Sequence, residues 1–254
     1  RSVSAFLLNR SSDLEIGDSE VHDASLSYAT ELFPGLTLIG IDSGNMAHAK
    51  KTTISWCSQK AAEARDQGNQ VIAMVHHSLI PHFYGQNSFM VLSVIDNHDI
   101  LRDSLISAGV KVVLTGHYHI SDNTRFMDNA GREIYDICTG SPLSYPCDYR
   151  KLVFDDQFKQ LKILTESITT LDGYDDFPNH AKGRLEDAFL RWAYHWFENH
   201  QVNEQVTEIM SQSVAEAFII HAEGNEPANP ATEEALVLYD EILAMAPFFE
   251  GDAL

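Results

Sequence analysis

The stretch KVVLTGHYH, Lys111–His119, decides the fold together with VIAMVHH, Val71–His77, which lies upstream. Each begins with a run of β-branched and apolar residues and ends in histidines. Continuous apolar runs, as opposed to alternating ones, are typical of strands buried on both faces of a parallel sheet. Open α/β sheets bind ligands just beyond the carboxyl ends of their strands. We therefore expect a ligand site where these two strands end.

The segments around these strands predict a β-α-β-α-β series. The expected elements, in chain order, are a strand at Leu36–Ile41, a helix at Thr52–Gln67, a strand at Val71–Val75, a helix at Asp99–Ala108 and a strand at Val112–Leu114. Such a series favours a parallel sheet with right-handed crossovers. The loop 78–97 is long and rich in aromatic residues, which favours a role beside a substrate.

The pattern changes beyond residue 120. Arg132–Cys138, Lys151–Phe154 and Phe158–Thr165 are predicted to be short antiparallel strands. Past residue 173 the pattern becomes helical, with a third helix expected to open at Asn229 and Pro230. Two apolar helix faces are predicted, one formed by Leu185, Ala188, Phe189, Trp192 and Trp196 and the other by Val206, Ile209, Met210 and Ala217. The predicted class is α/β with a C-terminal helical region, divided into domains at 1–170 and 171–254.

Composition excludes several classes of function. A net charge of −20 gives no basic field for general binding to nucleic acid or an anionic membrane. No apolar run is long enough to cross a membrane. The three cysteines form neither a disulfide framework nor a CxxC zinc pattern, and we expect them to be small buried apolar residues. The compartment stays open.

The histidines at the two strand ends indicate a metal site. Neutral imidazole is the commonest side-chain metal ligand. A GHxH sequence after an apolar strand, with HH ending a second strand at βαβ spacing, is far more specific than a single histidine. On an extended backbone His117 and His119 would face different sides, which favours two adjacent metal ions. Gly116 would let the backbone pass close to them.

These motifs resemble the last two motifs of the calcineurin-like metallophosphoesterases. HHSLIPH, LTLIGIDS, GVKVVLTGHYH and TGSPLSYPCDYR are similar to the branch related to cyclic-nucleotide phosphodiesterases, which carries extra C-terminal helices. The resemblance implies hydrolysis of a small phosphate ester by a hydroxide bridging two metal ions, which can be Fe, Mn, Zn or Co. It further implies that His76 and His117 bind one ion and that His119 binds the other. His77 is then the candidate catalytic residue, beside a ligand or facing the substrate.

Other polar residues near the strand ends have weaker assignments. Asp42, in IDSGN, corresponds to a residue beside the site and not to a ligand. Asn45, His82, Tyr118 and Asp122 either line the pocket or are ordinary polar loop residues, and the sequence favours neither.

The family's earlier motifs, DxH, GDxxD and GNH[DE], have no counterpart in the chain. GDSEVHD at Gly17–Asp23 matches GDxxD only loosely and has no strand before it, so we treat it as a coincidence. We therefore expect the C-terminal portion of a metallophosphoesterase, with the N-terminal part of its sandwich missing and no activity of its own. An open sheet edge promotes pairing, so a homo-oligomer or association with the missing N-terminal segment is predicted. The alternative is a mononuclear zinc hydrolase or metal-binding module that uses His76, His117 and His119 alone.

Overall fold

The computed structural model describes residues 2–4, 25–83 and 85–224. Two sequence predictions, the loop at 17–23 and the helix opening at 229, lie outside these residues. The chain forms two compact units, which divide at the junctions 141/142, 147/148 and 166/167. The first unit contains the sheets, and the second contains two long helices.

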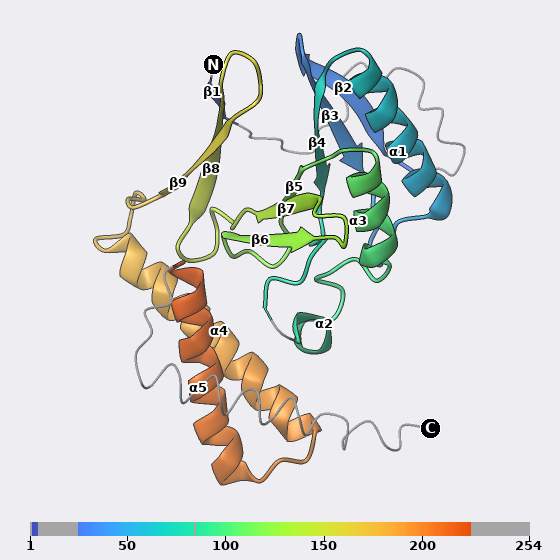
Figure 1. The fold of residues 1–254 in the computed structure, drawn as a ribbon. Helices are drawn as coiled ribbons and strands as arrows, with labels where there is room; N and C mark the ends of the chain where they lie inside the picture. Colours follow the sequence, from blue (N-terminus) through green and yellow to red (C-terminus); the bar gives the residue numbers. More distant parts are fainter. Residues whose placement is uncertain (1, 5–24, 84, 225–254) are drawn as a thin grey trace. The chain divides into compact units, whose positions relative to one another are not determined.

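The first unit is organised around a six-stranded mixed sheet. Its strands are β2 (Tyr28–Phe33), β3 (Leu36–Ile41), β4 (Gln70–Val75), β5 (Val112–Thr115), β6 (Asp122–Met127) and β7 (Glu133–Cys138). Their order in the sheet is β2-β3-β4-β5-β7-β6 (Figure 1). β3, β4, β5 and β7 run parallel, and β2 and β6 pair antiparallel at the two edges. The α/β class predicted from the sequence is confirmed.

Helices cover one face of this sheet. They are α1 (Lys51–Asp66) and α3 (His98–Ser107), while the short α2 (Gln86–Phe89) lies in the segment between β4 and α3. α1 connects β3 to β4, and α3 lies between β4 and β5 in the chain, so the predicted β-α-β-α-β series is confirmed. Figure 1 shows α1 and α3 on the same side of the sheet. Side chains alternate along each strand, so Ile39 and Ile41 pack with the helices.

The opposite face carries a second apolar cluster and a second sheet. β1 (Ser2–Ser4), β8 (Asp148–Phe154) and β9 (Leu161–Ser167) form this three-stranded sheet. Leu36 and Leu38 of β3 pack with Leu152 and Phe154 of β8. The first unit therefore has three layers, helices, large sheet and small sheet. β3 is buried on both sides, as its uninterrupted apolar sequence predicts.

One strand prediction needs correction, and two strands were not predicted. The segment predicted as Arg132–Cys138 forms β7, which pairs antiparallel with β6 but parallel with β5, and so was wrong as a purely antiparallel strand. β2 and β6 were not predicted. Both are edge strands whose residues alternate between partly buried and exposed, and their mixed polar sequences, YATELF and DNTRFM, lack a continuous apolar run.

The second unit is a helical hairpin of α4 (Phe177–Asn199) and α5 (Glu204–Ala222). Phe189 stacks on Phe218 at a centroid distance of 4.0 Å, and Trp192 meets the same ring edge-on, so the aromatic stripe of α4 is packing surface. The predicted face of α5 is wrong in part, because Val206 and Ile209 are exposed. No helix in the described part of the chain is both long and apolar enough to span a membrane.

Candidate functional site

The ends of β4 and β5 lie side by side. The two strands are parallel neighbours, with Ala73 opposite Val113 and Met74 opposite Leu114. Just beyond them, the Gly116 N–H donates a hydrogen bond of 3.0 Å to the His76 carbonyl oxygen. The two histidine-bearing segments are therefore joined at the carboxyl edge of the sheet, where ligands bind in this class of fold.

Three histidines gather at this edge. Each of His76, His77 and His117 offers a ring nitrogen, and these nitrogens all lie within 4.8 Å of one another. His76 Nε2 and His117 Nδ1 are 3.0 Å apart. His77 is buried, His117 is half-buried and His76 is exposed, so the cluster opens toward solvent on one side.

His77 is held from the neighbouring strand β3. The Ser43 hydroxyl, beyond the end of β3, lies 2.7 Å from His77 Nδ1, and both residues are buried. Because this contact uses Nδ1, Nε2 is the nitrogen that remains for an ion or a substrate. Asp42 has a different task, since its carboxylate accepts hydrogen bonds from the backbone N–H groups of Gly44 and Leu26. These bonds fix the turn after β3.

The backbone after β5 bends instead of continuing as a strand. His117 and His119 have φ angles of 72° and 66°, in the left-handed region that residues other than glycine seldom adopt. Tyr118, between them, is buried. The expectation that His117 and His119 alternate on an extended backbone is therefore wrong. Backbone strain of this kind is concentrated at functional sites.

His119 lies outside the three-histidine cluster. It is exposed, yet its charge acts on both His76 and His117. It is therefore near the cluster without joining it, and its assignment to a second metal ion stays a prediction.

The cluster keeps its imidazoles neutral. Burial lowers the pKa of His77 to about 4, with the charges of His117 and His76 acting in the same direction. Partial burial, followed by the charge of neighbouring histidines, lowers the pKa of His76 and of His117 as well. A neutral imidazole retains the lone pair that binds a metal ion. The three rings are thus in the protonation state that metal binding requires near pH 7.

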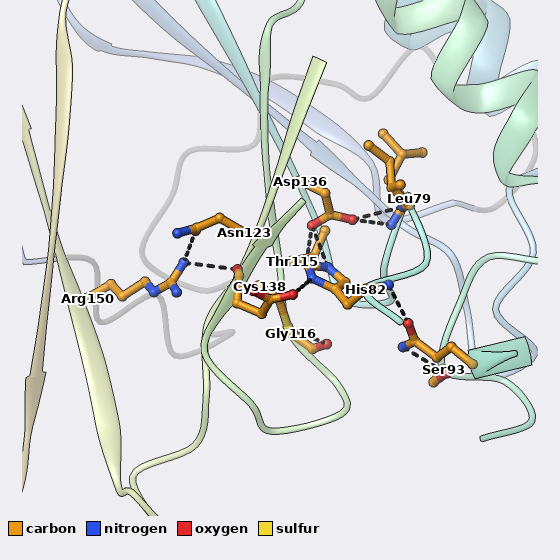
Figure 2. Close-up of polar contacts among 12 residues, drawn as sticks. Leu79, His82, Ser93, Thr115, Gly116, Asn123, Asp136, Cys138 and Arg150 are labelled. Atoms are coloured by element: carbon orange, nitrogen blue, oxygen red, sulfur yellow. Dashed lines mark hydrogen bonds and ion pairs between the residues drawn. The ribbon is translucent and has the colours of Figure 1, made fainter. Parts of the chain in front are cut away.

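Four further residues were predicted either to line the pocket or to be ordinary loop residues, and they differ in burial and in their contacts. Asn45 is exposed in the turn after β3, whereas Tyr118 is in the interior. The side chain of His82 is fully buried, with Nδ1 2.9 Å from Asp122 Oδ2. His82 and Asp122, whose side chain is partly exposed, therefore belong to one polar network, and Figure 2 shows His82 within it.

Asp136 lies at the centre of this network and was not identified from the sequence. It is fully buried on β7, and its Oδ2 accepts the N–H groups of Leu79 at 2.7 Å and Ile80 at 2.9 Å. Its Oδ1 accepts a hydrogen bond from the Thr115 hydroxyl and lies 3.4 Å from His82 Nε2. The available signal was an acidic residue inside the apolar strand sequence EIYDIC.

Comparison with known proteins gives a distant likeness in fold. No family model matches the chain, and no curated protein matches it. Among solved structures it is similar to a dimetal phosphatase from Danio rerio, with 13% sequence identity and a TM-score of 0.42. The match covers 57% of this chain and 61% of that one, so the chain spans less than two thirds of the phosphatase.

Proposed function

We propose that this chain is a metal-dependent phosphoester hydrolase whose ion is held by His76 Nε2 and His117 Nδ1. The observation that carries the proposal is the 3.0 Å separation of these two nitrogens. Two nitrogens about 2.1 Å from one ion, at right angles to each other, are about 3.0 Å apart. Without an ion these two nitrogens share a hydrogen bond, which a bound cation would replace once the donating ring takes its other neutral tautomer.

A bound divalent ion would polarise a phosphoryl oxygen and acidify a water molecule. The chain's own residues would orient the reactants around it. His77, with Nδ1 engaged by Ser43, would direct Nε2 toward the ion or toward an oxygen of the phosphate ester. His119, exposed beside the cluster, is proposed to contribute to a second ion. A small phosphate ester, with diesters favoured over monoesters, is the proposed substrate.

A mononuclear zinc site is the second candidate. It is favoured by three imidazole nitrogens lying within 4.8 Å of one another, the number that many catalytic zinc sites use. The third ligand would then be His77, in place of the His119 predicted from the sequence. The two candidates differ in the number of ions bound and in the effect of removing His119.

The test is metal content per chain, combined with hydrolysis of bis-p-nitrophenyl phosphate after titration with Mn²⁺, Zn²⁺, Co²⁺ or Fe²⁺. We expect binding of one or two ions and turnover that falls at least about 100-fold in His117→Ala. His195→Ala, which removes an exposed histidine from α4, should retain both properties. Two ions, with loss of one in His119→Ala, favour the binuclear site, and one ion that His119→Ala retains favours the zinc site. Absence of both binding and turnover, or a His117→Ala variant equal to the parent, would overturn the proposal.

A further inference from the structure

Asp136 contacts both of the segments that carry the clustered histidines. Leu79 and Ile80, whose N–H groups it accepts, follow His77 by two and three residues. Thr115, whose hydroxyl donates to its other oxygen, precedes His117 by two residues. A single buried carboxylate therefore ties the segment after β4 to the end of β5 (Figure 2).

We propose that Asp136 is a positioning residue, which sets the distance between His76 and His117 by fixing the two segments that carry them. This inference rests on the metal site proposed above. It goes beyond that site because neither of the two candidate sets of metal ligands includes Asp136.

The position of Asp136 in the sheet supports this role. Asp136 lies on β7 opposite Val113 of β5, so its side chain reaches the end of β5 from the neighbouring strand. Burial of a carboxylate is costly unless several donors compensate it. Here two backbone N–H groups and one hydroxyl donate to it. An apolar side chain at this place would remove all three bonds and leave two N–H groups unsatisfied.

His82 anchors Asp136 from the other side. Its ring lies between Asp136 Oδ1, 3.4 Å from Nε2, and Asp122 Oδ2, 2.9 Å from Nδ1. The chain near Asp122 is fastened in turn to β8, because Arg150 Nη1 donates to Asn123 Oδ1 at 2.6 Å and to the Asp122 carbonyl at 3.3 Å. The carboxylate is thus held in one orientation. A carboxylate held in this way fixes the two segments bonded to it, and so fixes the positions of the histidines that they carry.

The test compares Asp136→Asn with two controls on the same β6–β7 hairpin. Asp128→Asn makes the same chemical change at a carboxylate that caps the turn, where it accepts the N–H groups of Ala130 and Arg132. Ile134→Ala removes a fully buried side chain from β7 and lowers stability without touching the network. Thr115→Val removes only the hydroxyl that links Asp136 to β5. All four variants are made in the full chain.

The first readout is the Kd for Co²⁺, followed by its visible absorption spectrum. Loss of a residue that supports ligands typically weakens binding about 10–100-fold, so we expect at least a tenfold rise for Asp136→Asn. For Thr115→Val we expect the Kd for Co²⁺ to rise at least about threefold, a smaller change because only one of the hydrogen bonds to Asp136 is lost. Asp128→Asn and Ile134→Ala should stay within about twofold of the parent. If Asp136→Asn does not fold, Thr115→Val decides.

The second readout separates this inference from the proposed function. In the metal-free chain, NMR signals of the His76, His77 and His117 rings should move in Asp136→Asn and Thr115→Val but not in the controls. If the parent binds none of Co²⁺, Mn²⁺, Zn²⁺ and Fe²⁺ and shows no turnover, the proposed function fails, and the ring signals still decide the positioning role. Unchanged ring signals, unchanged Co²⁺ affinity in a parent that binds the ion, or an equal loss in Ile134→Ala would each overturn the inference.

Discussion

His77 and His82 lie in the same segment after β4, yet their surroundings leave the first ring neutral and the second positively charged. Burial acts on both and by itself lowers the pKa of each ring. Around His77, repulsion from the protonated forms of two further histidines adds to this effect and brings the pKa to about 4. Around His82, the hydrogen bond with Asp122 and the nearby charge of Asp136 outweigh burial and raise the pKa to about 9.

The comparison shows that neighbouring charge, and not burial, distinguishes the two regions. The cluster of His76, His77 and His117 holds neutral rings, whose lone pairs suit a metal ion. The network around Asp136 holds His82 as a cation, which has no lone pair to offer. The first region is suited to binding, and the second to holding the chain in place.

Removal of His82 should have the largest effect on stability. His82→Asn would leave two carboxylates without their cation, and breaking a buried ion pair in this way costs about 3–5 kcal/mol. His76→Asn, at an exposed position of the cluster, should change the free energy of unfolding by less than about 0.5 kcal/mol. Urea unfolding of the two variants measures the difference. Equal losses would remove the distinction between the two regions.

The charge of His82 should also make stability depend on pH. Its folded pKa of about 9 lies above the unfolded value of about 6.5, so protonation favours the folded chain. The contribution, on the order of 3 kcal/mol, is complete below pH 6.5 and is lost as the pH rises through 9. The measurement is the free energy of unfolding of the parent minus that of His82→Asn, between pH 6 and pH 9.5. Titrating groups that do not contact His82 cancel in this difference.

The pH experiment needs a probe that belongs to the first unit. Of the three tryptophans, Trp56 lies in α1, whereas Trp192 and Trp196 lie in α4 of the second unit. Replacing both of the latter with phenylalanine lets fluorescence follow the first unit alone. A difference that stays constant over this pH range would contradict a charged His82.

Loss of Ser43 should have a smaller effect than loss of His82. Ser43→Ala removes a hydrogen bond between uncharged groups and leaves His77 Nδ1 buried without its partner, at about 1–2 kcal/mol. Ser55→Ala, at an exposed position of α1, is the matched control and should change the free energy of unfolding by less than about 0.5 kcal/mol. Thermal or urea unfolding of the two variants measures the difference in their stability. A loss as large as that of His82→Asn would mean that the bond to His77 is ionic.

The contrast between the regions also marks what the sequence could predict. Continuous apolar runs predicted β3, β4 and β5, and the order of elements predicted that β4 and β5 would end together, which is how His76 and His117 were found. Asp136 could not be found in this way. Its role depends on β7 lying parallel to β5 with a register that places it opposite Val113, a long-range pairing that no local pattern encodes.

Two local predictions were wrong for physical reasons. Residues other than glycine adopt positive φ uncommonly, so the bend at His117 and His119 gave no signal, and an extended backbone was expected. On α5 the apolar residues were assumed to face inward, but small polar side chains, Thr207 and Ser211, are buried while Ile209 is exposed. Helix periodicity gives the spacing of a face, and the neighbouring helix determines which face is covered.

The smallest predicted effect tests where backbone strain is carried. His117 has a φ of 72°, whereas neither His76 nor His82 has a positive φ. Because glycine adopts positive φ without a steric cost, His117→Gly should be more stable than His117→Ala by about 1 kcal/mol. At His76 the sign should reverse, with glycine roughly 0.5–1 kcal/mol less stable than alanine, since its only effect there is greater freedom of the unfolded chain. Unfolding of the four variants without metal measures both differences. Both variants at a given position lack the same imidazole, so the difference between them reports on backbone conformation alone. Opposite signs would place the strain at the binding region, on the segment that presents His117, and the same sign at both positions would mean that the bend after β5 costs the chain nothing.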